Sequence, residues 1–377
     1  MEVGKTMKIL QSLKISKKLL RELDYGTIIF AICIVIFGCI NIYSATVKNS
    51  GTHFFKMQII WLILGLIVMY VLLAFDYMLI ENYAVIIYWA GVVLLIIGDI
   101  FGKVTNGANS WINIGPISIQ PSEFAKIGMT IMLAKKLDGM EGRINDSKNL
   151  LELMFYAAVP MILIVIQPDM GMTMVSFFIV LGIFYCIGLN YKVIIGGITS
   201  ILLLVVGVWN SPIMQSYWKV RLLSVLTPDK NVLGSGLQLV QSKIAIGSGG
   251  ILGRGFGKGV QFNFIPENYT DFIFAVLSEE WGLIGALVLI LLYGIIIYRL
   301  IKIAKESKDI FGSVLCVGFI SSILFSIMQN IGMTIGVMPI TGITLPFMSY
   351  GGSSILTCFI SLGLVLNVGM RRKKINF

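Results

Sequence analysis

The residues best suited to chemistry in this chain are a few ionisable side chains inside or beside long apolar segments. They are Asp99, Glu123, Lys126, Asp169, Asp271, Glu279 and Glu280. A charge at membrane depth is costly, so each of them is by default a functional hypothesis. The one histidine, His53, lies in a short loop and offers no histidine-rich metal site. Acid–base chemistry must therefore fall to the carboxylates.

Asp271 is the most conspicuous of them. It follows a polar, glycine-rich stretch and opens an apolar segment over residues 271–298, where a water-facing loop is expected to meet the bilayer. A carboxylate in the first turn of that helix suits the helix dipole, and a simple N-terminal cap charge is the alternative. Glu279 borders the same helical face and Glu280 points the opposite way. The face itself carries small residues that allow close helix approach, namely Ala275, Ser278, Gly282 and Gly285.

Glu123 and Lys126 lie three residues apart on another apolar segment. This spacing places them on one helical face, where mutual neutralisation explains how the segment tolerates both charges. Glu123 and Lys126 are candidates for a functional site, and a purely structural ion pair is the alternative. Asp169 follows Gln167-Pro168 in a tight turn between two apolar segments and is expected to cap the second.

The elements that must position these residues are membrane helices. The chain has 377 residues, of which 57% are hydrophobic and only 13% charged. Soluble domains carry about twice that share of charge. The five cysteines all lie in apolar runs and indicate packing rather than disulfides or metal ligation. We predict an all-α polytopic membrane protein with about ten transmembrane helices, at residues 26–46, 57–75, 79–99, 121–137, 150–166, 171–189, 192–209, 271–298, 311–334 and 347–369.

The distribution of the 29 lysines and arginines predicts the orientation. They concentrate at the N-terminus, at the C-terminus and in alternate short connections, so both termini are expected in the cytoplasm. The net charge of +10 is then mainly a topology signal, and nucleic-acid binding is a poor interpretation of it. The first apolar segment is too long for a signal-peptide core and indicates an uncleaved span.

The polar stretch over residues 210–270 predicts one large extracellular loop between helices 7 and 8, with short helices of its own. It holds Arg221 and Lys243, and glycines that alternate around Arg254 and Lys258. Backbone N–H groups freed by glycine could approach a phosphate there. A merely flexible loop is the alternative.

A second interruption, at residues 339–354, contains two prolines and three glycines within an apolar stretch. Irregular backbone at membrane depth is tolerated only where it is buried or lines a wet cavity. This segment, which includes Ser353, therefore points to a polar chamber on the outer side.

These motifs together resemble the SEDS family (shape, elongation, division and sporulation), the polytopic peptidoglycan polymerases that include RodA and FtsW. The resemblance covers nearly the whole chain, and one departure is Ser110, where many members have arginine. The opening Leu23-Asp24-Tyr25 looks more like the RodA branch. The matching motifs are Trp111-Ile112, Gln120 to Lys126, Gln167 to Gly171, Ala245 to Gly259, Pro266 to Phe274, Glu279-Glu280, Asn330 to Gly332, and Leu345 to Ser354.

The resemblance implies a multi-pass enzyme of the bacterial cytoplasmic membrane, with one membrane domain over residues 26–370 between a basic N-terminus and a basic tail at 371–377. It implies a glycosyltransferase that polymerises lipid II into undecaprenyl-diphosphate-linked glycan strands on the outer face, for cell elongation and shape. The implied partner is a class B penicillin-binding transpeptidase. The family's essential aspartate maps onto Asp271.

The mechanism expected from this resemblance uses Asp271 as general base on the acceptor sugar's 4-hydroxyl. Cations must stabilise the departing diphosphate, and the candidates are Lys126, Arg221 and Lys243, with a divalent ion (Mg²⁺ or Mn²⁺) as a further option. We predict that the substrate-binding residues are Glu123, Lys126, Asp169, Arg221, Lys243, Glu279 and Ser353. A lipid II flippase is the main alternative, since buried charges and broken helices suit a transporter. A scaffold that only recruits the transpeptidase is the third.

Overall fold

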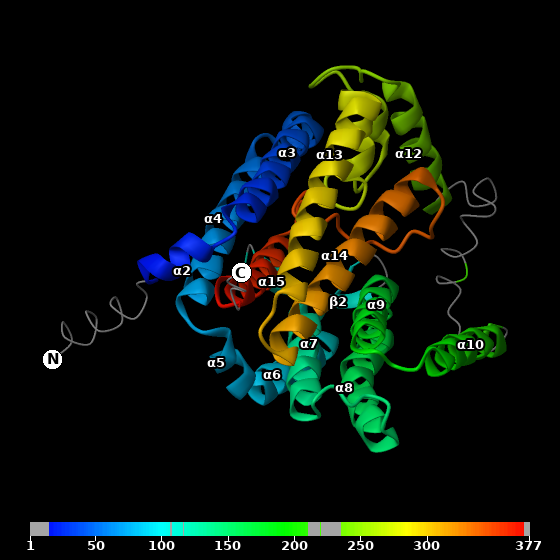
Figure 1. Cartoon of the computed structure of the whole chain (residues 1–377). Coiled ribbons are helices and arrows are strands. Elements are labelled where there is room, and N and C mark those ends of the chain that lie inside the picture. The colour runs from blue at the N-terminus through cyan, green and yellow to red at the C-terminus, as the bar shows by residue number, and fades with distance from the viewer. Residues whose placement is uncertain (1–14, 106–107, 116, 210–218, 220–234, 373–377) are drawn as a thin grey trace.

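The computed structural model describes residues 15–105, 108–115, 117–209, 219 and 235–372. The fold is a bundle of long helices (Figure 1). Its α-helices are α2 (Lys17–Glu22), α3 (Tyr25–Ser50), α4 (His53–Ala74), α5 (Tyr77–Asn82), α6 (Ala84–Phe101), α7 (Pro121–Gly139), α8 (Ser147–Ile166), α9 (Met170–Ile187), α10 (Tyr191–Val208), α12 (Ser235–Gly249), α13 (Ile273–Lys305), α14 (Ile310–Ile335) and α15 (Gly352–Met370).

Among the residues that the structure describes, eight helices are long and apolar enough to cross a membrane, namely α3, α4, α6, α8, α9, α13, α14 and α15. The two remaining predicted spans coincide with α7 and α10. The sequence of α7 includes five charged side chains, two of them in its first half, Glu123 and Lys126. The apolar part of α10 is Tyr191–Leu204, which is short for a span. The helical membrane class is therefore confirmed, with eight candidate spans among the described residues instead of ten.

Several helices begin at residues that suit the unpaired N–H groups of the first helical turn. The side chain of Asp24 accepts from Thr27 N at the start of α3, and that of Asp309 accepts from Gly312 N at the start of α14. Pro121 stands at the start of α7, where the N–H that proline lacks would have no helical partner. These local signals explain why the predicted helix positions lie close to the observed ones.

A small antiparallel sheet was not predicted. It consists of β1 (Lys103–Thr105), β2 (Ala108–Ile114) and β3 (Ile117–Ile119), with β2 in the centre. β2 and β3 pair in the register Ile112↔Ile119 and Ile114↔Ile117. The sheet joins α6 to α7, and it brings Trp111 to the wall of the cavity described below.

The polar stretch before α13 contains helical structure, as predicted. α12 and the 3₁₀ turn η2 (Gln261–Phe264) lie within it. The C-terminal end of α12 packs against α13, beside which it is drawn in Figure 1. Arg221, one of the predicted cations, lies outside the described residues.

The prediction that Asp271 lies in the first turn of a continuous helix is wrong. α13 begins at Ile273, so Asp271 lies in the preceding turn. The helix is also interrupted at Gly282, where φ is 63° and ψ is −160°. This region of backbone conformation is essentially restricted to glycine. The interruption divides the predicted small-residue face, so that face does not run unbroken from Asp271.

Replacement of Gly282 by alanine is expected to destabilise the protein by about 3 kcal/mol or more, because backbone strain and a clash add together. A Cβ at this position would stand 2.4 Å from the backbone nitrogen of Gly253. Thermal denaturation in detergent measures the loss. Gly294→Ala on the same helix is the matched control, since its added Cβ meets nothing within 4 Å. An equal melting temperature for the two variants would contradict the role given to the kink.

Candidate active site

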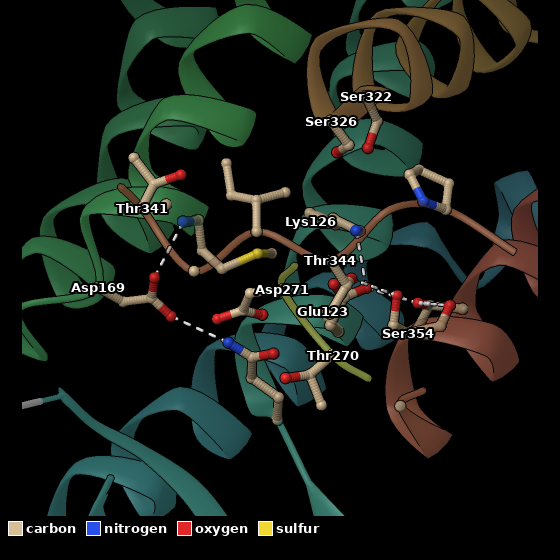
Figure 2. A pocket seen from close by; sticks show the side chains of 18 of the residues that line it. Glu123, Lys126, Asp169, Thr270, Asp271, Ser322, Ser326, Thr341, Thr344 and Ser354 are labelled. Carbon is tan, nitrogen blue, oxygen red and sulfur yellow. Dashed lines mark hydrogen bonds and ion pairs between the residues drawn. The ribbon is translucent and has the colours of Figure 1, made fainter. Parts of the chain in front are cut away.

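One cavity gathers several of the ionisable residues that the sequence singled out. Its volume is about 200 Å³, and its walls come from β2, α7, α9, α14 and α15, with the irregular segments 267–271 and 341–346. Glu123, Lys126, Asp169 and Asp271 all line it. Figure 2 shows the carboxyl group of Asp271 between Asp169 on one side and the Glu123–Lys126 pair on the other.

The main chain around Asp271 is held from two directions. Asn330 Nδ2 on α14 donates to the carbonyl oxygen of Asp271 at 2.8 Å, and Ser349 Oγ donates to that of Thr270 at 2.6 Å. The Asp271 carboxylate lies close to Gly342, where a Cβ would be 3.4 Å from Oδ2. Gly342 has φ +75°, a conformation that favours glycine. Tertiary contacts therefore fix the position of Asp271.

Glu123 and Lys126 form the ion pair that their spacing predicted. Lys126 Nζ lies 2.7 Å from Glu123 Oε2, and the side chains are only 13% and 5% exposed. Thr357 Oγ1 on α15 also donates to Glu123 Oε2, at 2.5 Å. Both side chains line the cavity, so the pair presents a lysine ammonium to it together with the carboxylate that compensates its charge.

Asp169 has two oxygens with different partners. Oδ1 accepts from the backbone nitrogen of Met172 at 3.0 Å and caps α9, which confirms the predicted cap. Oδ2 accepts from Gln120 Nε2 at 3.0 Å. Asp169 therefore ties the start of α9 to the start of α7 across the cavity.

Tyr350 also lines the cavity, and its acid–base state follows from burial. Burial raises the pKa of Tyr350, so the phenol keeps its proton at neutral pH. It can donate a hydrogen bond to a substrate, but it is not a base there.

The comparison with protein families decides which of the chemistries open to these residues applies. The family model described as cell cycle protein, which covers FtsW, RodA and SpoVE, matches residues 25–374. The chain belongs to the SEDS family.

Relatives and solved structures agree with this over nearly the full length of this SEDS chain. The peptidoglycan glycosyltransferase MrdB of Escherichia coli (strain K12) is 32% identical over 359 residues, which are 94% of this chain and 95% of the relative. The stage V sporulation protein E of Bacillus subtilis (strain 168) is 37% identical over 364 residues, or 92% and 96%. This SEDS chain is a peptidoglycan glycosyltransferase and a multi-pass membrane protein.

Solved structures also share its fold, among them the following two. One, from work on the coordination of polymerization and crosslinking by a peptidoglycan synthase complex, superposes with a TM-score of 0.82 at 31% identity, and covers 93% of this chain and 98% of that one. RodA of Thermus thermophilus superposes with a TM-score of 0.71 at 28% identity, with the same coverage.

Ser353 lies behind the cavity wall of the SEDS fold. Its hydroxyl accepts from the backbone nitrogen of Gln120 at 3.1 Å and donates to the carbonyl of Ser118 at 3.2 Å. It therefore joins the start of α15 to the link between β3 and α7, while its neighbour Ser354 lines the cavity. Ser353 supports the wall, and we expect its effect on substrate to be indirect.

Lys243 and Glu279 lie elsewhere. The Lys243 side chain packs over Gly336 at the C-terminus of α14, where a Cβ would be 2.6 Å from Nζ. Both oxygens of the fully buried Glu279 accept backbone N–H groups, from Val260 at 2.7 Å, Gln261 at 2.9 Å and Phe262 at 2.9 Å. Lys243 therefore lies beside the C-terminus of α14, and Glu279 holds the segment that precedes Asp271.

Several residues of the cavity escaped the sequence analysis. Thr357, which donates to Glu123, gave no local signal, because its role depends on the approach of α15 to α7. A signal was present for Ser322 and Ser326. With Asn330, noted above only as part of a family motif, they recur every four residues on one face of α14. Two of them line the cavity and the third holds the carbonyl of Asp271. A polar stripe on an otherwise apolar span could have revealed this wall.

The donor set does not fit a metal site held by the protein alone. Within the ranges that the structure describes, no three His, Cys, Asp or Glu side chains come together closely enough to hold an ion. Glu123 and Asp169 are also engaged in the ion pair and the helix cap described above. No catalytic step is assigned to a metal here.

Proposed function

We propose that this SEDS glycosyltransferase polymerises lipid II on the outer face of the cytoplasmic membrane, with Asp271 as general base. The observation that carries the proposal is the cavity itself, a space of about 200 Å³ whose walls hold Asp271 together with Lys126. Asp271 stands in this cavity between Asp169 and the Glu123–Lys126 pair, and it is the residue onto which the family's essential aspartate maps. This position favours Asp271 for the chemistry.

The proposed reaction is a direct displacement. Asp271 takes the proton of the acceptor sugar's 4-hydroxyl, and the oxygen forms a bond to the donor's anomeric carbon. The bond from that carbon to the diphosphate breaks, and the configuration inverts from α to β. The carbon acquires oxocarbenium character on the way, as in glycoside hydrolysis. A positioned base of this kind contributes about 10²- to 10⁴-fold.

Lys126 is the proposed partner of the departing diphosphate. It is the only lysine or arginine among the described residues of the cavity wall. A preorganised ammonium in a confined site stabilises the negative charge that develops on the leaving group. Glu123 and Thr357 hold Lys126 in place through the contacts given above. Arg221 remains a proposed second cation, and the packing of Lys243 over α14 makes it a weaker one.

The proposed orientation places both termini in the cytoplasm. Arg21 near the N-terminus and Arg372 near the C-terminus line one cavity with Arg299, which lies towards the C-terminal end of α13. Asp271 immediately precedes the opposite end of the same helix. This arrangement supports termini on one side and chemistry near the other. The prenyl chains of both substrates would then lie between helices, open to lipid.

A partner transpeptidase of the class B penicillin-binding type is part of the proposal. Its support is the likeness to the chain solved in a peptidoglycan synthase complex that coordinates polymerization and crosslinking.

The function is tested by incubating purified protein in detergent with lipid II and resolving the products on a gel. Polymer is expected, because an enzyme needs no second compartment. Absence of polymer, together with lipid II movement across the membrane of protein-containing vesicles, would favour a flippase. Absence of both, with capture of the transpeptidase, would favour a scaffold.

We further propose a role in elongation, which rests on the RodA-like opening of the chain around Asp24. Depletion of the protein in its own host is expected to turn rods into round cells, because side-wall synthesis stops while division continues. Phase-contrast microscopy after depletion measures cell width and length. Filaments with unchanged width would point to division instead, and normal growth with failed spores would point to sporulation.

A further inference from the structure

A second cavity lies at the other end of α13. Its volume is about 510 Å³. The kink at Gly282 keeps the span from Ile273 to Arg299 at or below ~39 Å, the length of a straight helix, and the hydrocarbon core of a bilayer is about 30 Å thick. With the start of α13 at the outer boundary, as proposed above, this length carries the cavity to the headgroup region of the opposite leaflet.

The lining of this basic cavity has a surplus of positive charge. Its cations are Arg21, Arg299, Lys302 and Arg372, against the carboxylates Glu22 and Asp24. Arg299 Nη1 pairs with Asp24 Oδ1 at 2.6 Å, and Arg372 pairs at 2.5 Å with a glutamate outside the lining, Glu306. Within the described ranges, neither Arg21 nor Lys302 makes an ion pair. Two positive charges on facing elements, α2 and α13, are thus available to an anion.

The wall between these charges has a fixed shape. A Cβ at Gly26 would stand 2.6 Å from the guanidinium carbon of Arg299, so glycine leaves the room that this side chain occupies. The same guanidinium lies over the ring of Phe30, 5.7 Å from its centroid. Leu23, only 9% exposed, packs into the main hydrophobic core and fastens the end of α2. The cavity is therefore part of the packed fold.

The helices that form the cavity also present apolar side chains to the surrounding lipid. Ile29 on α3 is 57% exposed, and on α13 Leu291 is 63% and Tyr298 70% exposed. α3 and α13 pack against each other and are drawn side by side in Figure 1. Tyrosine at such a boundary is typical of the headgroup level of a membrane. A ligand here meets cations at one end and apolar surface at the other, which is the chemistry of an amphiphile.

We propose that the basic cavity binds the phosphate headgroup of one anionic phospholipid from the leaflet on the side of the chain termini, with its acyl chains along α3 and α13. Basic pockets between helices at this depth suit anionic headgroups, and each lysine or arginine near such a surface adds to the attraction. The proposal is independent of the polymerase mechanism. It rests on the depth, charge and apolar flank of this cavity.

The test counts lipids that stay bound to the purified full chain in native mass spectrometry. The protein is taken from nanodiscs that contain phosphatidylglycerol and phosphatidylcholine with identical acyl chains. The wild type is expected to retain one phosphatidylglycerol selectively. The R21Q/K302Q double variant is expected to bind it about 30-fold more weakly. K17Q/K305Q removes equal charge from α2 and α13 outside the cavity, and it should keep the selectivity.

The other outcomes overturn the proposal. Equal loss in both double variants would mean a diffuse surface charge and no site. No selectivity in the wild type would remove the site altogether. Displacement of the bound lipid by an excess of inorganic phosphate would assign the cavity to a soluble phosphate ligand. Polymerisation by R21Q/K302Q in detergent, expected at the wild-type rate, checks that the variant is folded.

Discussion

An Asp271→Asn variant is expected to polymerise lipid II about 10²- to 10⁴-fold more slowly than the wild type, the loss that removal of a general base produces. Asparagine keeps the shape of the side chain but does not accept a proton at neutral pH. The contacts that hold this turn involve the carbonyl oxygens of Thr270 and Asp271, which the substitution leaves in place. Initial rates of polymer formation in detergent measure the effect, and melting curves of the same samples check the fold.

The matched control is Glu267→Gln in the same turn. It makes the same chemical change on a side chain that also lines the cavity, and whose carboxylate accepts from Thr270 Oγ1 at 2.7 Å. Less than a tenfold loss is expected, because a glutamine oxygen still accepts that hydrogen bond. Near wild-type polymerisation by Asp271→Asn would exclude Asp271 as the base. Inactivity of Glu267→Gln with Asp271→Asn active would transfer the role to Glu267.

The parts of the site that sequence could predict depend on short-range geometry. Glu123 and Lys126 meet because three residues of helix bring side chains onto one face. Asp169 caps α9 because a short carboxylate before a helix reaches its first free N–H groups. Each contact is determined by residues within one turn, so spacing alone was sufficient.

The parts that could not be predicted depend on how distant segments pack. The position of Asp271 is fixed by Asn330 and Ser349, which are far away in sequence. The interruption of α13 at Gly282 arises because the chain around Gly253 packs against it, and its own helix-forming neighbours gave no sign of it. Glu279 was predicted to bind substrate because a carboxylate within an apolar segment is a functional candidate by default. Its N–H partners come from a loop whose path the sequence does not encode locally.

A Lys126→Met variant is expected to lose both stability and activity. Removing one partner of a buried ion pair leaves the other charge uncompensated, which costs about 3–5 kcal/mol. Glu123 is only 5% exposed, so this cost applies here. The polymerisation rate is expected to fall by about 10²- to 10³-fold as well, because the diphosphate loses its stabilising charge. This is the effect of removing one preorganised electrostatic donor. Thermal denaturation measures the first effect and polymerisation rates the second.

The double variant Glu123→Gln with Lys126→Met separates the two roles of Lys126. Neutralising both partners removes the buried unpaired charge, so much of the lost stability should return, and Thr357 can still donate to the glutamine oxygen. Polymerisation should stay as low as in Lys126→Met, because no ammonium faces the leaving group. If activity returned together with stability, Lys126 would be a structural residue and the diphosphate would need another cation. Stability restored without activity is the result that assigns Lys126 to the reaction.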